Sequence, residues 1–345
     1  MTSIRNKKQH LPLRAFCLLA LVIAATACLH LPVRAEAVSR KIVFIRSNLK
    51  PDPGSAMVEQ FKATLRKRGY VEGNNIEYVD ILIQKNGRES VQEARAAAEL
   101  HQDSAALFVT AGAVTIHVRS RLAMHDIPQL FAPVLKEEAL RMLPSVTDPP
   151  GTNLSGVYLA YPPEKILNLA RLILPGIKNY AFVFDSRIST DLLMKEAFDR
   201  LKEEDRRGIA VHQLDVAKGT EGVLQQMKAL RIEAFGGIIG AYKNRETLSA
   251  SGVPMITSLL MDIDVNGVAD RIREGNILAG LFHPMDYCGE QAGEMAADLL
   301  DGKNTPAATL PRPGRQVAFV NMATAARLNV AIPFTVLEAV DIVVK

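Results

Sequence analysis

The sequence predicts an α/β protein with two lobes, each built on a parallel β-sheet flanked by helices. Residues 105–134 give the basic unit: a short apolar run, a turn of small residues, a helix-spaced segment and a second apolar run. Strand, helix and strand in this order build a parallel sheet. Similar units precede and follow this one, and the chain of 345 residues exceeds what one hydrophobic core usually needs. We therefore expect two lobes.

The first 35 residues are expected to be an export signal that lies outside the fold. Residues 1–14 carry basic and no acidic side chains, and residues 15–27 are apolar or small, too few to span a bilayer permanently. Small residues at Val33 and Ala35 suit cleavage after Ala35. Lipid attachment at Cys28 is the second choice, because Ala25 stands where that motif normally has Leu. Either alternative predicts a periplasmic or otherwise extracytoplasmic protein.

The charge balance changes when this segment is set aside. Five basic residues fall within it (Arg5, Lys7, Lys8, Arg14 and Arg34), so residues 36–345 hold 36 basic and 37 acidic side chains, a net charge of −1. Such a balance gives no reason to expect nucleic acid or an anionic membrane surface as a partner. Cys288 is the one cysteine left, so neither disulfides nor a cysteine zinc site is expected. We expect a monomer without a cofactor.

Apolar periodicity predicts the elements of the first half. The predicted strands are 41–45, 76–83, 105–109, 127–134 and 151–157, and the predicted helices are 55–68, 90–102 and a segment after 113. Met57, Phe61 and Leu65 share one face of the first of these helices, as in a helix packed on a core. Ser90 and Glu93 have the spacing of a capping box, which predicts a helix that begins there.

The same rhythm restarts at Tyr161. The predicted helices are 164–174, 191–204, 220–229, 285–300 and 324–328, and the predicted strands are 180–184, 210–214, 235–239, 254–258, 276–282 and 317–321. The strand at 276–282 is expected to cross back toward the first lobe. The pattern assigns lobe 1 to 36–157, completed by about 283–315, and lobe 2 to 158–282, completed by about 316–345.

Small or polar residues gather where the predicted strands end. In open α/β sheets, ligands bind beyond these carboxyl ends, and two such edges facing one another form a cleft that a hinge can close. The candidate ligand-binding residues are Ser47, Asn48, Thr110, Ala111, Gly112, Ala132, Asp185, Tyr242, Asn244, Thr257 and, at the start of the helix after 276–282, Asp286.

Each candidate also has a purely structural interpretation. The small residues at 110–113 leave backbone N–H groups and a helix N-terminus open to a carboxylate, or Gly112 simply permits a tight turn. Asp185 is suited to pair with an ammonium group, or to cap a turn. Tyr242 is suited to contact an apolar or aromatic part of a ligand, or to be a half-buried residue beside the hinge. Asn48 and Thr257 fit either a hydrogen-bonding or a turn role.

No catalytic motif is visible. HExxH, GxSxG, the P-loop and GxGxxG are all absent. His283 and Asp286 have a spacing that an acid–base or metal pair would allow, but a capping Asp286 beside a solvated His283 fits the strand-to-helix turn better. We therefore expect neither an enzyme nor a metal site.

Three parts of the chain resemble a known family. These are Gly69-Tyr-Val-Glu-Gly-Asn-Asn-Ile76, then Gly151-Thr-Asn-Leu-Ser-Gly-Val157 with Leu174-Pro-Gly176, and Gly289-Glu-Gln-Ala-Gly-Glu-Met295 with Asn321-Met-Ala-Thr-Ala-Ala326. Together they are similar to the ABC-transporter substrate-binding proteins of the tryptophan/tyrosine-type group. The resemblance implies the type I periplasmic-binding-protein fold, with two lobes joined by a multi-strand hinge. It also implies capture of a small organic ligand, amino-acid-like or carboxylate-bearing, for an ABC permease.

Two departures from that family touch the predicted cleft. Ala132-Pro133-Val134-Leu135 lacks the Asp of the usual Asp-Pro-Val motif, and residues 242–252 are shorter than the usual helix at that point. The ligand can therefore differ from an aromatic amino acid. The departures also leave open the alternative that the binding module serves a membrane sensor instead of a permease.

Overall fold

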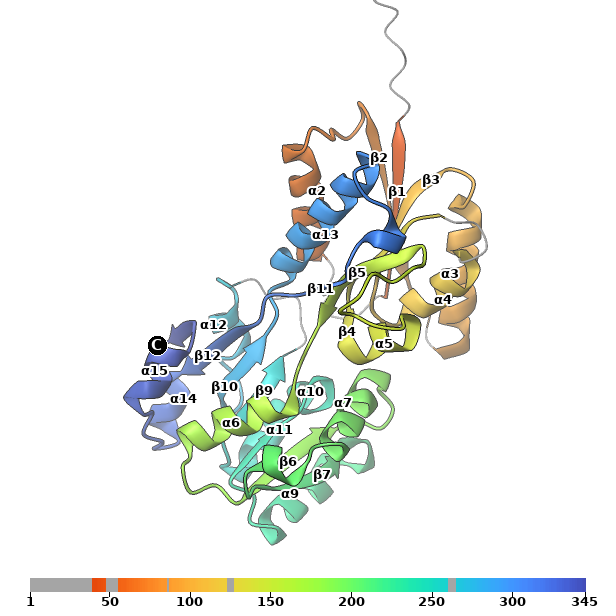
Figure 1. Cartoon of the computed structure of the whole chain (residues 1–345). Coiled ribbons are helices and arrows are strands. Elements are labelled where there is room, and N and C mark those ends of the chain that lie inside the picture. Colours follow the sequence, from red (N-terminus) through yellow and green to blue (C-terminus); the bar gives the residue numbers. More distant parts are fainter. Residues whose placement is uncertain (1–38, 48–54, 86, 123–126, 260–264) are drawn as a thin grey trace, which may run out of the picture. The chain divides into compact units, whose positions relative to one another are not determined.

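Two β-sheets organise the chain in a computed structural model, which describes residues 39–47, 55–85, 87–122, 127–259 and 265–345 (Figure 1). The first sheet has the strand order β11-β5-β4-β3-β1-β2, and all its neighbouring strands are parallel. The second has the order β13-β12-β10-β9-β8-β6-β7, with one antiparallel pair, β10 and β12. Helices flank both sheets (Figure 1). The α/β prediction is confirmed.

The first sheet follows the predicted strands closely. Its strands are β1 (Arg40–Ser47), β2 (Ile76–Ile83), β3 (Ala105–Ala111), β4 (Gln129–Leu135), β5 (Leu154–Leu159) and β11 (Arg312–Pro313). The helices with it are α2 (Ser55–Lys67), α3 (Gly87–His101), α4 (Thr115–Leu122), α5 (Lys136–Met142) and α13 (Met285–Leu300). Every residue of β4 is buried, as expected for a parallel strand covered on both faces.

The close contact of α2 and α13 depends on a glycine. A Cβ atom added to Gly289 in α13 would lie 2.2 Å from the backbone oxygen of Met57 in α2. The two backbones therefore touch directly at this point, which no larger residue permits. This contact attaches α13 to the first lobe, although the chain reaches it from the second sheet.

The second sheet holds the remaining elements. Its strands are β6 (Asn179–Phe184), β7 (Ala210–Asp215), β8 (Ala234–Gly236), β9 (Met255–Leu259), β10 (Ile277–Phe282), β12 (Val317–Asn321) and β13 (Ile342–Val344). Its helices are α6 (Pro163–Ile173), α7 (Ser189–Asp199), α8 (Glu203–Arg206), α9 (Thr220–Ala229), α10 (Ile239–Lys243), α11 (Arg245–Leu248), α12 (Val268–Arg271), α14 (Met322–Arg327) and α15 (Phe334–Ala339). Phe182 and Phe198 stack at 4.4 Å between ring centroids and fill the space between β6 and α7.

The chain passes between the sheets three times. It leaves the first sheet after β5, returns to it after β10 through α13, and leaves again between β11 and β12. The predicted multi-strand hinge is thereby confirmed. The division into lobes at 157, 282 and 315 stays a prediction. Across the described ranges, no helix is both long and apolar enough to cross a membrane.

Three local predictions are wrong. Helix α3 begins at Gly87, so Ser90 lies inside it, and the Glu93 carboxylate accepts hydrogen bonds from the backbone N–H groups of Gln84 and Lys85 at 3.0 Å. The single helix expected at 191–204 is two, because Lys202 has an extended backbone that separates α7 from α8. The strand expected at 235–239 ends at Gly236, and Ile239 already begins α10.

Candidate functional site

The carboxyl ends of β1 and β3 bring three of the candidate residues together. Ser47 ends β1, and Ala111 ends β3. Gly112 follows with a φ of 74°, and a Cβ atom added to it would lie 3.6 Å from Ser47 Oγ. A single 3₁₀ turn, Gly112–Val114, then leads into α4. Asn48 lies outside the described residues, so its role stays a prediction.

Two further candidates of the first lobe are buried within their strands. Thr110 is fully buried in β3, where its hydroxyl accepts a hydrogen bond from Gln129 Nε2 at 3.1 Å. Ala132 is fully buried in β4, and the peptide bond that follows it, to Pro133, is cis. The Thr110 hydroxyl is thus engaged with its own sheet.

Asp185 lies at the carboxyl end of β6 and is almost fully buried. Its carboxylate accepts hydrogen bonds from the backbone N–H, Nε and Nη2 of Arg187, at 3.0, 2.8 and 2.7 Å. The bonds from this guanidinium lower the pKa of Asp185. The Arg187 side chain itself is 72% exposed. The pair therefore presents a carboxylate that already holds one cation, and that cation is free to move into solvent.

Asp191, which the sequence analysis did not single out, supports this edge from within. Its carboxylate is fully buried and accepts the backbone N–H groups of Asp185, Ile239 and Gly240, at 2.9, 3.0 and 2.8 Å. Burial raises the pKa of Asp191, while the three N–H groups act in the opposite direction. Asp191 thereby fastens the end of β6 to the start of α10. In the sequence, the one feature that marks Asp191 is its position early in a predicted helix, and this position does not show which backbone groups its carboxylate binds.

The remaining second-lobe candidates make bonds inside the lobe. The Tyr242 hydroxyl donates to the backbone oxygen of Arg271 at 3.0 Å, and the Arg245 guanidinium stacks on its ring at 4.3 Å. Asn244 Nδ2 donates to the Gly240 oxygen at 2.8 Å. The hydroxyl of Thr257, fully buried in β9, donates to the oxygen and accepts from the N–H of Gly237. A ligand that used these groups would replace existing bonds.

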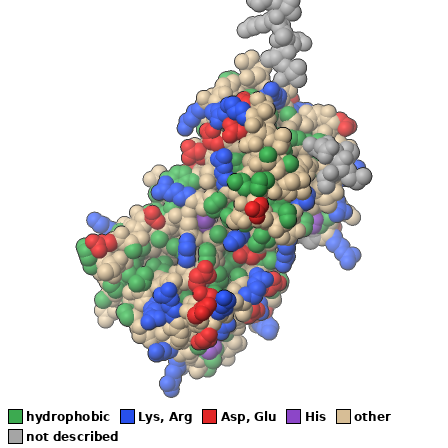
Figure 2. Space-filling view, in the orientation of Figure 1, with side chains coloured by type: hydrophobic (Ala, Val, Ile, Leu, Met, Phe, Trp, Pro, Cys, Tyr) green, Lys and Arg blue, Asp and Glu red, His purple; other side chains and the backbone are tan. Residues whose placement is uncertain are grey.

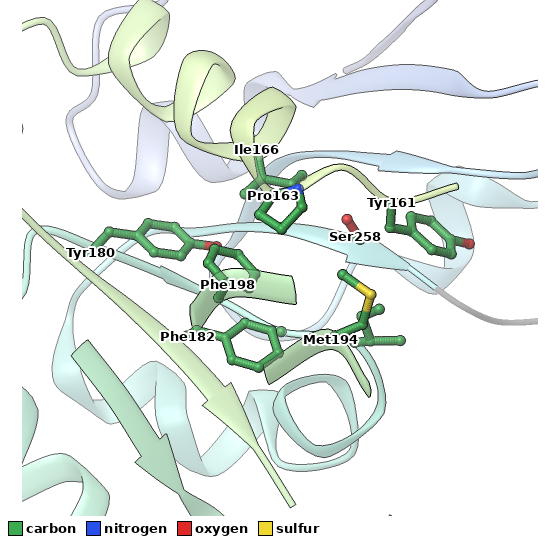
Figure 3. Close-up of a pocket in the computed structure, with 10 residues that line it drawn as sticks. Tyr161, Pro163, Ile166, Tyr180, Phe182, Met194, Phe198 and Ser258 are labelled. Carbon is green, nitrogen blue, oxygen red and sulfur yellow. The ribbon is translucent and has the colours of Figure 1, made fainter. Parts of the chain in front are cut away.

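A small cavity lies beside these residues in the second lobe (Figure 3). Its volume is about 10 Å³, which is room for about one water molecule. The lining is mainly aromatic and aliphatic, with Tyr161, Phe182, Met194 and Phe198 among its members and Ser258 as a polar one. An organic ligand does not fit into this cavity as it stands.

His283 and Asp286 lie where the chain re-enters the first lobe. His283 is 2% exposed, so the expectation of a solvated histidine is wrong. Its Nδ1 lies 3.0 Å from the backbone oxygen of Arg315, and its Nε2 lies 3.0 Å from that of Ala160. Asp286 is the acidic residue in the first turn of α13. Nearby Cys288 is fully buried, and burial raises its pKa to about 12.

The surface carries both signs of charge. Figure 2 shows Lys and Arg side chains interspersed with Asp and Glu side chains on the face in view. Within the described ranges, no group of three or more His, Cys, Asp or Glu residues could hold a metal ion.

Solved structures share this architecture. The ABC domain in complex with L-Trp from Streptococcus pneumonia has a TM-score of 0.71 at 16% identity, covering 89% of this chain and 100% of its own. The ligand-free, open structure of CD0873, a substrate binding protein from Clostridium difficile, has a TM-score of 0.69 at 18% identity, with coverage of 89% and 99%. A solute binding protein from R. palustris in complex with benzoate has a TM-score of 0.55 at 13% identity, with coverage of 78% and 85%.

At these identities the similarity shows the fold alone, the two-lobed type I periplasmic-binding-protein fold expected from the sequence. No curated protein sequence matches the chain. The model of the family described as "ABC transporter substrate binding protein" matches residues 45–344, nearly the whole described chain. The chain therefore belongs to the ABC transporter substrate binding protein family.

Proposed function

We propose that the protein is an extracytoplasmic solute-binding protein that captures a small organic ligand between its lobes and delivers it to an ABC permease. The observation that carries the proposal is the family match over residues 45–344 on a fold with three crossovers between two sheets. Crossovers of this kind let two lobes close on a ligand. The protein would hold its ligand without transforming it.

A carboxylate-bearing ligand suits the edge formed by Ser47, Ala111 and Gly112. These side chains are small, so an anionic group can approach the backbone N–H groups near the N-terminus of α4, where the helix dipole favours negative charge. L-Trp and benzoate, the molecules bound in two of the similar structures, both carry a carboxylate. Similarity of fold leaves the rest of the ligand open.

An amino-acid ligand would place its ammonium group at Asp185. This carboxylate is already ionised and held by Arg187, whose side chain has space to swing into solvent. The ammonium group would then replace the guanidinium as the partner of Asp185. Tyr242, Asn244 and Thr257 stay candidates for contacts on the same side, at the expense of their present bonds.

A thermal-shift screen tests this proposal. Amino acids and aromatic or aliphatic carboxylates are compared with analogues that lack the carboxylate, such as tryptamine and benzyl alcohol. A true ligand at a hundred times its Kd adds about 2.7 kcal/mol of stability. Proton NMR of the mixture after long incubation then separates binding from turnover. Failure of every carboxylate to stabilise the protein, or chemical conversion of the one that does, contradicts the proposal.

The contribution of Asp185 is tested by Asp185→Asn with Asp270→Asn as a matched control. Asp270 is a well-exposed acid that pairs with Arg273 at 2.7 Å on the surface. We expect Asp185→Asn to weaken an amino-acid ligand at least tenfold and to leave a simple carboxylate unaffected, as measured by calorimetry. Equal losses for both ligands would show that Asp185 does not contact an ammonium group.

A further inference from the structure

The three crossovers of the hinge meet at one buried side chain. His283 follows β10 in the second crossover, Ala160 follows β5 in the first, and Arg315 precedes β12 in the third. The two ring nitrogens of His283 lie 3.0 Å from the backbone oxygens of Arg315 and Ala160. The Tyr161 ring packs edge-on against the imidazole at 4.8 Å and holds it in place. One imidazole thus bridges all three segments.

The hydrogen-bond inventory of this bridge depends on protonation. Carbonyl oxygens only accept, and a neutral imidazole has one N–H to donate. The Ala160 oxygen already accepts a hydrogen bond from Gln316 Nε2 at 2.9 Å. The neutral ring therefore satisfies more groups by donating from Nδ1 to Arg315, which leaves the Nε2 lone pair facing the Ala160 oxygen. A second proton, on Nε2, turns that repulsive contact into a hydrogen bond.

We propose that His283 is a proton-dependent clasp of the hinge. Protonation at Nε2 adds the bond to Ala160 and restrains the first and second crossovers in the arrangement seen here. Loss of that proton releases this bond and lets the lobes move more freely. The clasp acts through the hinge, so it does not depend on which ligand the protein binds.

The groups around the ring set the pH at which this occurs. Burial is the largest influence on the pKa of His283 and lowers it, as does the charge of Lys165; the oxygens of Ala160, Arg315 and Gly314 oppose this. The net direction is downward, so the clasp forms only at a pH below the ordinary pKa of histidine.

Other titratable or charged side chains also lie near the clasp. Burial raises the pKa of both Tyr161 and Cys288. Lys165 is bonded to Gln316 Oε1 at 2.9 Å, Asp286 lies in the first turn of α13, and the Arg315 guanidinium lies over the Tyr287 ring.

Nitrogen-15 NMR of histidine-labelled protein reads the protonation directly. His283 is assigned as the signal that His283→Gln removes. We expect a neutral form that carries its proton on Nδ1 and an acidic form with both nitrogens protonated and slowly exchanging. A ring that stays neutral down to acid unfolding, or a neutral form protonated on Nε2, overturns the proposal. Should His283→Gln not fold, Gln316→Leu still tests it, because freeing the Ala160 oxygen shifts the neutral ring toward the Nε2 proton.

The effect on the hinge is measured by distances between spin labels at two exposed residues, Lys67→Cys in α2 and Lys228→Cys in α9, with Cys17 and Cys28 replaced by serine. The distribution of distances between the spin labels should narrow as the pH falls through the titration of His283. The ratio of protonated to neutral His283 rises tenfold for each pH unit of this fall. His212→Gln, which alters another partly buried histidine, should keep this response, and His283→Gln should lose it. An equal response in all three proteins overturns the clasp.

Discussion

Two buried tyrosines offer a matched test of how the first crossover is held. Tyr161, just before α6, donates its hydroxyl to the backbone oxygen of Leu259 at 2.8 Å. Tyr180, in β6, donates to the backbone oxygen of Ile256, also at 2.8 Å. Both acceptors belong to β9, and both tyrosines are at most 2% exposed. Burial raises the pKa of each hydroxyl, so both stay protonated donors.

Replacing either tyrosine by phenylalanine removes one hydroxyl and leaves one buried carbonyl oxygen without that partner. A neutral hydrogen bond lost in this way costs about 1–2 kcal/mol of unfolding free energy. We expect Tyr161→Phe and Tyr180→Phe to lower stability by this similar amount, with an unchanged dependence on urea concentration. The difference should lie in where the structure loosens, because Tyr161 belongs to a crossover and Tyr180 to the second sheet.

Urea denaturation measures the stability, and hydrogen exchange followed by mass spectrometry locates the loosening. Tyr161→Phe should accelerate exchange in residues 160–166 and in the neighbouring His283 segment, since the two rings are in contact. Tyr180→Phe should leave that exchange unchanged. If Tyr180→Phe opened the crossover as much as Tyr161→Phe, or if Tyr161→Phe cost less than about 0.3 kcal/mol, the reasoning would be refuted.

Three further tests address packing, charge and reactivity. Gly289→Ala should lower the free energy of unfolding by about 1–3 kcal/mol, because the new methyl group meets the Met57 backbone. Gly222→Ala in α9, with open space around it, should raise the free energy of unfolding by up to about 1 kcal/mol. Thermal unfolding compares the two variants. Asp80→Asn should lower the free energy of unfolding by about 1–3 kcal/mol, because it removes the carboxylate that lies 2.7 Å from the guanidinium of Arg46, a side chain only 5% exposed. Asp270→Asn on the surface should change the free energy of unfolding by no more than about 0.5 kcal/mol. Urea denaturation measures both. Cys288, buried and with its pKa raised to about 12, should react with iodoacetamide in concentrated urea and resist it in the folded protein, as peptide mass spectrometry will show; rapid native labelling would contradict its burial.

Sequence reasoning placed the elements where local pattern and tertiary packing agree. The helices at 220–229 and 285–300 and the strands at 76–83 and 317–321 have the predicted limits. The predicted capping box is wrong because the Glu93 carboxylate accepts hydrogen bonds from the backbone N–H groups of Gln84 and Lys85, which precede the helix. The spacing of Glu93 from Ser90 does not exclude these bonds. The break between α7 and α8 at Lys202 has no Gly or Pro that would have predicted it from the sequence.

The candidate site was less predictable, since its polar atoms find partners far along the chain. Thr257 bonds to Gly237, Tyr242 to Arg271, and Asp191 to the start of α10, pairings that require the folded sheet. Spacing in the sequence showed that these residues end strands or begin helices. It could not show which of their hydrogen bonds the protein itself would satisfy. Whether they bind a ligand stays a prediction.

The order of strands also affects how the chain matures. The outer strand β11 of one sheet and the strands β12 and β13 of the other are all made of residues 312–344, which follow every other strand of both sheets in the chain. Neither sheet is complete until these residues have been synthesised, so the chain that precedes them lacks a finished lobe that could fold early. For a protein that we propose to be exported, this delay in folding favours passage through a translocon as an unfolded, extended chain.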